Sequence, residues 1–479
     1  MLTIKSKAKF IGKYLLKAVV LLIIIFPIDI KWDSKESCFN DVETQGDKDL
    51  FLHCLGVYSI DNLLRLDIWE NLGTAEFDSE NWDEAINAYR HVASYGNLSK
   101  DSQIRLGEAY YQLNQFENAS MIWQNSVKTY PDQYDTYKSL VKLHLRLSEI
   151  AEVERVINQW SEKFPDGFEP FYYKGLLTIL NDNEEATLIL EECVKLDDSF
   201  VGKIQVLLDG INESDKVQNE WERLTLKGVA YGKIGSWEFA EYSFRKAIEY
   251  NSAYSDAWAF LGEAQQQLGY ADGYTSLTNA LKNSPGSSNA NGMMALYWRR
   301  RASYGLASAY LFNLTQRYPG DYHWHLEWGH TLIEAGYPAE AIQHYEKASM
   351  IKPDELIIWE SIAKASLKNS VNLRTIGLPA ARRANELNPN NPVLHNLMGV
   401  IMTNLNDPIS AERFFFKAIS MDRSLYSAYY HLGQLYLTQG KRDLAENYLR
   451  FVVAYDADDS CESVSTQILI DRYFPDRND

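Results

Sequence analysis

The stretch IRLGEAYYQLNQFENASMIWQNSVKTYP at residues 104–131 decides the fold, because its pattern returns at 326–353 (LEWGHTLIEAGYPAEAIQHYEKASMIKP) and at 430–457 (YHLGQLYLTQGKRDLAENYLRFVVAYDA). Each stretch has a glycine, a large residue three positions later and an alanine nine positions after that. An aromatic or aliphatic residue follows four positions further on. Working outward, the glycine recurs 34 residues earlier, at Gly73. A pattern with this period predicts a stack of repeated helical hairpins.

Registration of the chain on this pattern gives eleven units. They start near residues 66, 100, 134, 168, 221, 255, 288, 322, 356, 392 and 426. A small residue falls in the first helix of most units: Gly73, Gly107, Gly175, Gly228, Gly262, Gly329, Gly399 and Gly433. An alanine near the start of the second helix is equally regular: Ala85, Ala119, Ala240, Ala341, Ala411 and Ala445. Small residues at these positions allow two helix backbones to approach closely, and we therefore expect them at the helix crossings.

Over residues 66–459 the pattern resembles the tetratricopeptide repeat family. The resemblance implies an all-α fold, an α-solenoid wound as a right-handed superhelix from about eleven helix-turn-helix units of 34 residues. It also implies that the first helices line a concave face that binds proteins or peptides. The chaperone-binding members of the family use Lys and Asn at set positions of that face. No Asn stands at the ninth position of any unit here, so this subtype is rejected.

Departures from the repeat divide the chain. Residues 201–220 are an insertion, for which we expect a short helix at 204–208 followed by a polar loop. We also expect a hinge here, between a first block of repeats at 66–200 and a second block at 221–459. Residues 460–479 are expected to form a C-terminal capping helix and tail. Residues 32–65 are expected to form a linker and an N-terminal capping helix.

Residues 1–31 form a segment of a different kind. Six lysines against one aspartate give it a net charge of +5, and its apolar run AVVLLIIIF begins at Ala18. This pattern predicts a single-pass transmembrane helix that acts as an uncleaved signal anchor, with the N-terminus in the cytoplasm and the repeats outside it. A cleaved signal peptide with a secreted or periplasmic product is the alternative, and a buried helix is the third interpretation.

Charge and motifs exclude several functions. The formal net charge is −18, so we expect no nucleic-acid partner. No phosphate-binding loop, dinucleotide-binding fingerprint, nucleophile elbow or zinc-protease motif occurs, so we expect no cofactor, no catalytic residue and no enzyme. The histidines of YHWHLEWGH (His323, His325 and His330) suit groove lining or packing better than metal ligation.

The cysteines are few. Cys38 and Cys54 flank an acidic linker and are able to pair outside the cytoplasm, although the sequence leaves a disulfide open. Cys193 falls at a small repeat position, where a buried free thiol is expected.

The function predicted from these features is a membrane-held interaction scaffold. Extending the resemblance residue by residue gives these candidate partner-binding positions: Arg299, Arg300, His323, His330, Glu334, Lys364, Lys368, Asn396, Asn404, Tyr430 and Gln434. The lining has mixed charge and many amides, which suits an extended peptide. Residues 299–301, three arginines, form either a site for an acidic peptide or phosphate, or a helix end at which the cations interact favourably with the helix dipole. An accessory subunit of a membrane-bound enzyme, or of a secretion or envelope polysaccharide assembly, is the alternative function. An enzyme in its own right is the third.

Overall fold

The computed structural model describes residues 66–370, 372–455 and 461–474, and these form helices and short connections with no strand. The predictions for residues 1–65, including the membrane segment, Cys38 and Cys54, lie outside the described part of the chain. Within the described part, no helix has the length and apolar character needed to cross a bilayer.

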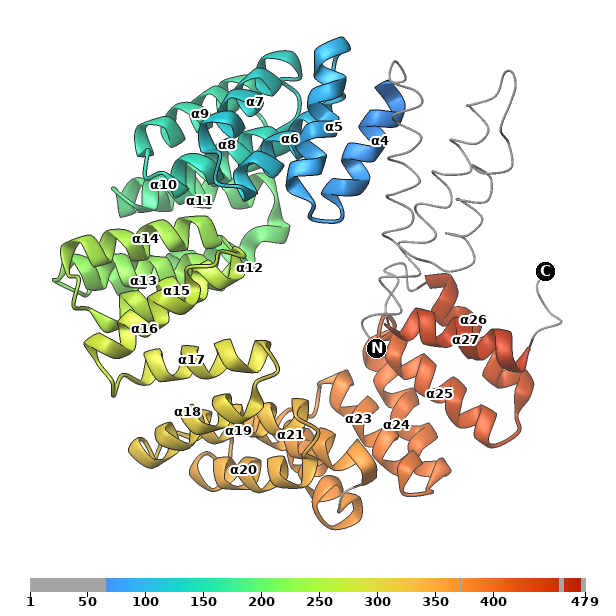
Figure 1. Cartoon of the computed structure of the whole chain (residues 1–479). Coiled ribbons are helices and arrows are strands. Elements are labelled where there is room, and N and C mark those ends of the chain that lie inside the picture. The colour runs from blue at the N-terminus through green and yellow to red at the C-terminus, as the bar shows by residue number, and fades with distance from the viewer. Residues whose placement is uncertain (1–65, 371, 456–460, 475–479) are drawn as a thin grey trace, which may run out of the picture. The chain divides into compact units, whose positions relative to one another are not determined.

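The chain divides into two compact units, residues 1–250 and 251–479. The described helices of the first unit are α4 (Leu66–Phe77), α5 (Trp82–Tyr95), α6 (Lys100–Gln112), α7 (Phe116–Thr129), α8 (Tyr134–Arg146), α9 (Ile150–Lys163), α10 (Phe168–Ile179), α11 (Asn183–Leu196), η1 (Asp198–Phe200), α12 (Val201–Asp215), α13 (Glu220–Lys233) and α14 (Trp237–Tyr250). Apart from η1 and α12 they form antiparallel hairpins, α4 with α5 through α13 with α14 (Figure 1).

The second unit repeats this arrangement. Its helices are α15 (Ser255–Gln267), α16 (Gly273–Asn283), α17 (Ser288–Arg300), α18 (Tyr304–Arg317), α19 (Tyr322–Glu334), α20 (Pro338–Ile351), α21 (Leu356–Leu367), η2 (Lys368–Ser370), η3 (Leu373–Gly377), α22 (Leu378–Leu387), α23 (Pro392–Asn404), α24 (Pro408–Met421), α25 (Tyr426–Thr438), α26 (Arg442–Tyr455) and α27 (Cys461–Tyr473). In both units the first helix of each hairpin starts within one residue of the predicted position. The superhelical hand stays a prediction.

The predicted glycines lie where the two helices of a hairpin cross. A Cβ added at Gly107 would stand 2.2 Å from Trp123 Nε1, and one at Gly329 would stand 2.2 Å from Tyr345 Cε1. The remaining six face a large residue of the second helix in the same way: Gly73, Gly175, Gly228, Gly262, Gly399 and Gly433. The predicted alanines of the second helices are fully buried: Ala85, Ala119, Ala240, Ala341, Ala411 and Ala445. The hairpin core is therefore built from a small residue facing a large one.

Residues 201–215 correct one expectation. The short helix and polar loop predicted here are a single helix, α12, of 15 residues. Ile204, Leu207 and Ile211 recur at helical spacing and are buried, and they hold the polar second half of the segment in the helix. Helix α12 packs against α13, and the division between the compact units falls after Tyr250.

The hairpin α13–α14 also contacts helices far away in sequence. The Tyr231 hydroxyl donates to the Leu176 carbonyl at 2.6 Å, and the buried Lys227 ammonium donates to the Ile179 carbonyl at 2.7 Å. Helix α14 packs against α8, where Arg245 donates to the Leu145 carbonyl at 2.7 Å. These carbonyls belong to the last turns of α10 and α8, so side chains of the fifth hairpin satisfy helix ends of the third and fourth.

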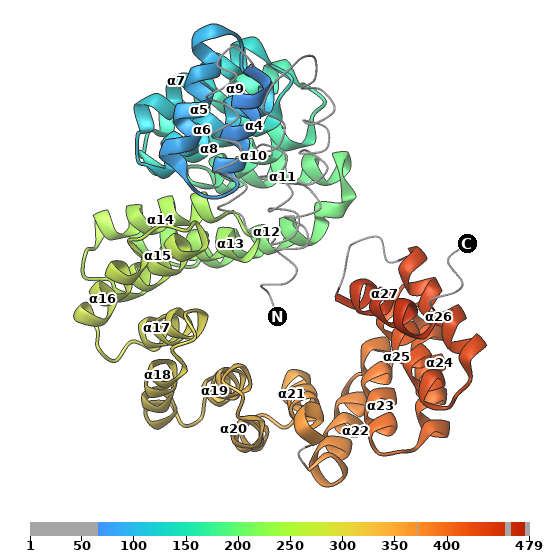
Figure 2. The same cartoon turned by 45° about the vertical axis from the view of Figure 1, so that its right-hand side comes forward.

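The C-terminal end of the second unit is closed by α27, which packs against α25 and α26 (Figure 2). Its Ile470 and the following Phe474 are buried. A helix was predicted here, and burying the open side of the last hairpin is what a solenoid requires. Cys193 in α11 is a buried free thiol as predicted, and burial raises its pKa to about 11.

Candidate functional site

The first helices of the hairpins in the second unit are α15, α17, α19, α21, α23 and α25. We call the surface formed by their side chains at the predicted partner-binding positions the A-helix face. Helix α15 packs directly against α17, α21 against α23, and α23 against α25. Side chains on the A-helix face therefore meet their counterparts one repeat away.

Arg300 reaches back to α15. Its two terminal guanidinium nitrogens donate to the two carboxylate oxygens of Glu263, each at 2.7 Å. The Glu263 side chain is 10% exposed and that of Arg300 is 35% exposed. This fork-to-fork geometry gives a strong, directional ion pair. The pair links neighbouring first helices and leaves Arg300 little free charge for an acidic ligand.

Arg299 reaches forward to α19. Its guanidinium lies 2.6 Å from Glu327 Oε2 and 3.6 Å from Glu334 Oε1, and His330 Nδ1 lies 3.5 Å from Glu327 Oε1. Burial of Glu327 would raise the pKa of its carboxyl, but the His330 hydrogen bond and the Arg299 charge outweigh it and lower that pKa. The structure thus brings Arg299, His330 and Glu334 together around Glu327.

Three predicted residues lie apart from any cluster. His323 is exposed and its ring Nδ1 lies 2.8 Å from Asp321, the N-cap of its own helix. Lys364 pairs with Glu360 one turn earlier on α21, and Lys368 is exposed at the C-terminal end of that helix. The structure does not bring these three side chains to one place.

Asn396 and His431 form a partly buried polar contact between α23 and α25. His431 Nδ1 lies 3.1 Å from Asn396 Oδ1, and the Asn396 amide nitrogen donates to Ser427 Oγ at 3.2 Å. The His431 ring also stacks on Phe415. Burial penalises the charged ring and lowers the pKa of His431 to about 4, so the ring is neutral at pH 7.

Beside His431 lies a pocket of about 360 Å³ between α23, α25 and α27. The predicted residues Asn404 and Gln434 line it together with Val400, Leu437 and the α27 residues Leu469 and Tyr473. Asn404 donates to the Val400 carbonyl and Gln434 donates to the Tyr430 hydroxyl at 2.7 Å, so both amides are held in place and keep hydrogen-bonding capacity. The pocket is an apolar hollow with amide groups at its wall, which is able to accept a side chain and bind the main chain next to it.

His325, the remaining histidine of the YHWHLEWGH segment, contacts His344 of α20. His325 Nδ1 lies 3.2 Å from His344 Nδ1, and the His344 ring lies against Trp328. Burial, with a smaller effect of Lys347, lowers the pKa of His344 to about 4, and the pKa of His325 is lowered for the same reasons. No group of three or more potential metal ligands occurs among the residues that the structure describes.

Several residues that organise this face were not predicted from the sequence: Glu327, Ser361, Ser427 and His431. His330 Nε2, for example, lies 3.4 Å from Ser361 Oγ, 31 residues away. The contacts between first helices join residues 28 to 37 positions apart, close to one repeat. Pairing each candidate residue with opposite charges or polar groups at that separation would have found them.

Sequence comparison identifies the repeats directly. Models of the tetratricopeptide repeat match residues 71–134, 327–355 and 426–459. These matches, together with the helical hairpins, support a tetratricopeptide repeat protein. No curated protein matches the chain in sequence.

Several solved structures align with this chain at low identity. PilF of Pseudomonas aeruginosa is 18% identical, and the alignment covers 46% of this chain and 98% of that chain with a TM-score of 0.37. Yeast Tom70 is 14% identical over 86% of this chain and 96% of its own, with a TM-score of 0.40. A tetratricopeptide repeat protein from Parabacteroides merdae is 14% identical over 52% of this chain and 99% of its own, with a TM-score of 0.41.

Proposed function

We propose that this protein is a non-catalytic interaction scaffold that binds peptide or protein partners along the A-helix face and is held at a membrane by its N-terminal segment. The repeat matches support the general role, because tetratricopeptide repeat proteins act as protein-interaction scaffolds. The observation that carries the binding site is the pocket of Asn404 and Gln434, where two anchored amides stand beside an apolar hollow. An extended peptide with an apolar side chain matches this combination.

The ion pairs of α15, α17 and α19 have a different part in this proposal. Arg299 and Arg300 already donate to carboxylates, so an acidic ligand would have to displace Glu263 or Glu327. Their role is to hold neighbouring first helices in register, which fixes the surface that the partner meets. The partner's main contacts then fall on α23, α25 and the closing helix α27.

Site-specific photo-crosslinking in cells tests the binding surface. A benzophenone amino acid replaces Gln434 in the full-length chain, and the matched control places it at Met350, which is 81% exposed on the second helix α20. The proposal expects a discrete adduct from position 434 and none from 350. The absence of an adduct at 434, or the same adducts at both positions, contradicts the site. Mass spectrometry of the adduct also shows whether the partner is a membrane enzyme.

Membrane attachment is tested separately. The basic residues before the apolar run at Ala18 support an anchor with the repeats outside the cytoplasm. The full-length chain is expected to stay with the membrane pellet after alkaline carbonate treatment, and a variant without residues 1–31 is expected in the supernatant. Extraction of the full-length chain by carbonate would refute the anchor and leave the proposed binding face untouched.

A further inference from the structure

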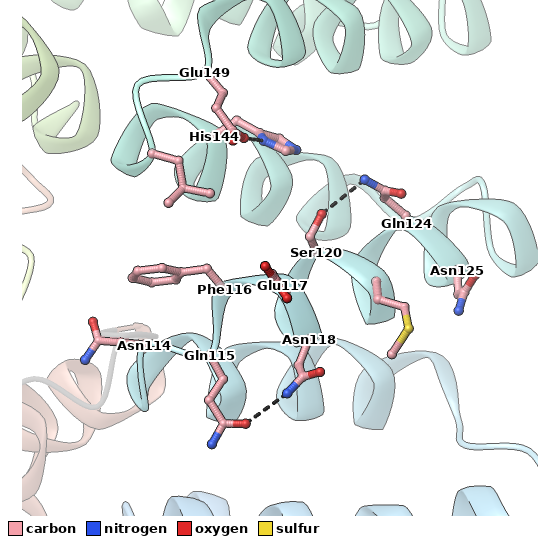
Figure 3. A pocket seen from close by; sticks show the side chains of 12 residues that line it. Asn114, Gln115, Phe116, Glu117, Asn118, Ser120, Gln124, Asn125, His144 and Glu149 are labelled. Carbon is pink, nitrogen blue, oxygen red and sulfur yellow. Dashed lines mark hydrogen bonds and ion pairs between the residues drawn. The ribbon is translucent and has the colours of Figure 1, made fainter.

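The first unit contains a second pocket, of about 840 Å³, that the A-helix face does not include. It lies along α7, a second helix of its hairpin, and is bounded on the other side by the C-terminal end of α8 and the connection from α8 to α9 (Figure 3). We call it the α7 pocket and define it by the lining residues Phe116, Asn118, Ser120, Gln124, His144 and Glu149. Figure 3 shows His144 and Glu149 on one side of the hollow and the α7 side chains on the other.

Amide and hydroxyl side chains dominate the α7 side of the pocket. The Asn118 amide nitrogen donates to Gln115 Oε1 at 2.9 Å, and the Gln124 amide nitrogen donates to Ser120 Oγ at 3.1 Å. These bonds orient the side chains and use only part of their capacity, because each amide has two N–H groups and a carbonyl oxygen with two lone pairs. The wall therefore offers donors and acceptors side by side.

The opposite side carries a fixed histidine. His144 is buried, and its Nδ1 lies 2.7 Å from Glu149 Oε2. The other ring nitrogen, Nε2, is buried and has no hydrogen-bond partner among the described residues. A sugar hydroxyl both donates and accepts, so one placed beside this ring is able to bond to Nε2 after a small adjustment of the side chain.

The charges of the pocket select against anions. Its titratable lining residues are Glu117, His144 and Glu149, and no lysine or arginine is among the residues that line it. A phosphate or carboxylate ligand would meet two acidic side chains without a cationic partner. Glu149 is already bonded to His144, so most of the remaining hydrogen-bonding groups are neutral.

Apolar surface completes the lining. Phe116 contributes an aromatic ring, and Met121 and Leu147 are exposed at the pocket. A pyranose ring combines an apolar C–H face with hydroxyl groups that donate and accept hydrogen bonds at once. That combination matches an aromatic and aliphatic surface next to mixed amide and hydroxyl groups.

From this lining we infer that the α7 pocket binds a neutral oligosaccharide. Amides of α7 bind the hydroxyl groups, Nε2 of His144 bonds to one of them, and the Phe116 ring packs on a sugar face. The site uses residues of the first unit only, so it adds a second binding activity that does not depend on the proposed peptide site.

Isothermal titration calorimetry on the full-length protein tests the inference, in a zwitterionic detergent because a sugar headgroup would compete. The probes are maltotetraose, cellotetraose and the tetramer of N-acetylglucosamine, with tetralysine as the cationic comparison. At least one sugar is expected to bind. Gln124→Leu and Asn118→Ala should each weaken binding of that sugar by about 10-fold through the loss of hydrogen bonds.

The matched control is Gln316→Leu, an amide exposed on α18 outside both pockets, which should bind like the wild type. Unchanged thermal unfolding shows that each variant is folded. If none of the sugars binds, the inference is wrong. It is also wrong if only tetralysine binds and Glu117→Gln abolishes that binding, because the pocket would then be a cation site. Equal binding by all variants also overturns it, while none of these results affects crosslinking at position 434.

Discussion

At the scale of single residues, the small positions of the repeat set the packing. The sequence shows a glycine followed sixteen positions later by a large residue, as with Gly107 and Trp123. The structure adds the distances, which leave no room for a methyl group at Gly107. Periodicity could not supply those distances, because the same spacing tolerates alanine at Ala295 in the seventh unit.

Replacing Gly107 by alanine is expected to lower the free energy of unfolding by about 2 kcal/mol, because the new methyl group displaces the Trp123 ring. Gly202→Ala is the control, since no atom lies within 4 Å of a Cβ added there. It should be neutral or stabilise α12 by ~0.5 kcal/mol. Urea unfolding measures both. An equal effect of the two substitutions would contradict the packing argument.

The depressed pKa of His431 predicts a pH dependence of stability. Its pKa is about 4 in the folded protein and 6.5 without burial, so the unfolded chain binds the extra proton between these values. The free energy of unfolding should therefore fall as the pH drops from 6.5 to 4, by up to ~1.4 kcal/mol per pH unit from this group. Below pH 4 both states are protonated and this contribution stops changing.

Urea unfolding of His431→Gln against pH measures the contribution. The variant should show a shallower pH dependence than the wild type between pH 4 and 6.5. His323→Gln, which alters an exposed side chain, should keep the wild-type slope. Identical slopes for His431→Gln and the wild type would show that the buried ring is not responsible.

At the scale of elements, the first residue of each hairpin's first helix could be predicted to within one position. The single continuous helix α12 could not be predicted. The segment 201–215 lies outside the repeat, and its polar residues Asn212, Glu213 and Asp215 favoured a loop. Burial of Ile211 and Ser214 keeps these residues helical. Local composition failed here because the stabilising contacts come from packing.

The contact of α14 with α8 depends on Glu241, whose side chain is 2% exposed. Arg146 lies 2.8 Å and Arg245 lies 2.9 Å from its two carboxylate oxygens. Burial raises the Glu241 pKa, and both arginines oppose that rise. Glu241→Gln removes the buried carboxylate charge that Arg146 and Arg245 both face, and it is expected to cost about 3 kcal/mol of unfolding free energy.

Chemical denaturation of the full chain checks this value against Glu249→Gln. Glu249 pairs with Lys246 at the surface, and its side chain is 58% exposed. That substitution should change the stability by less than ~0.5 kcal/mol. If both variants lose a similar amount of unfolding free energy, the buried ion pairs of Glu241 do not stabilise the α8–α14 contact.

At the scale of the whole molecule, the sequence predicted the class of fold, but the arrangement of the candidate site only in part. The exclusion of nucleic acid stays a prediction. To predict a contact such as that of Arg300 with Glu263, one must know which side-chain rotamers meet between neighbouring repeats. The α7 pocket was not predicted, because most of its residues come from a second helix and from connections between helices, which the repeat pattern does not describe. The pattern describes what the repeats share, whereas this pocket depends on side chains that are particular to the second and third hairpins.

The net charge of −18 predicts that the full-length chain does not bind a labelled DNA duplex at physiological salt. Fluorescence anisotropy measures this, with a variant carrying glutamine at Lys5, Lys7, Lys9, Lys13 and Lys17 as the control for the basic N-terminal segment. Salt-sensitive binding that disappears in the variant would assign it to those lysines. Binding that survives in the variant would contradict the argument from total charge.

The long reach of the fifth hairpin has a consequence for how the protein is made. The Leu145 carbonyl finds its partner in Arg245, 100 residues later in the chain. At bacterial or eukaryotic elongation rates the ribosome needs about 5–20 s to add those residues. The carbonyls at the end of α10 wait for a shorter stretch, since Lys227 and Tyr231 follow 48 and 55 residues later. Until α13 and then α14 emerge, the ends of α10 and α8 stay hydrated, so these two helix ends acquire their side-chain partners in the order α10, then α8.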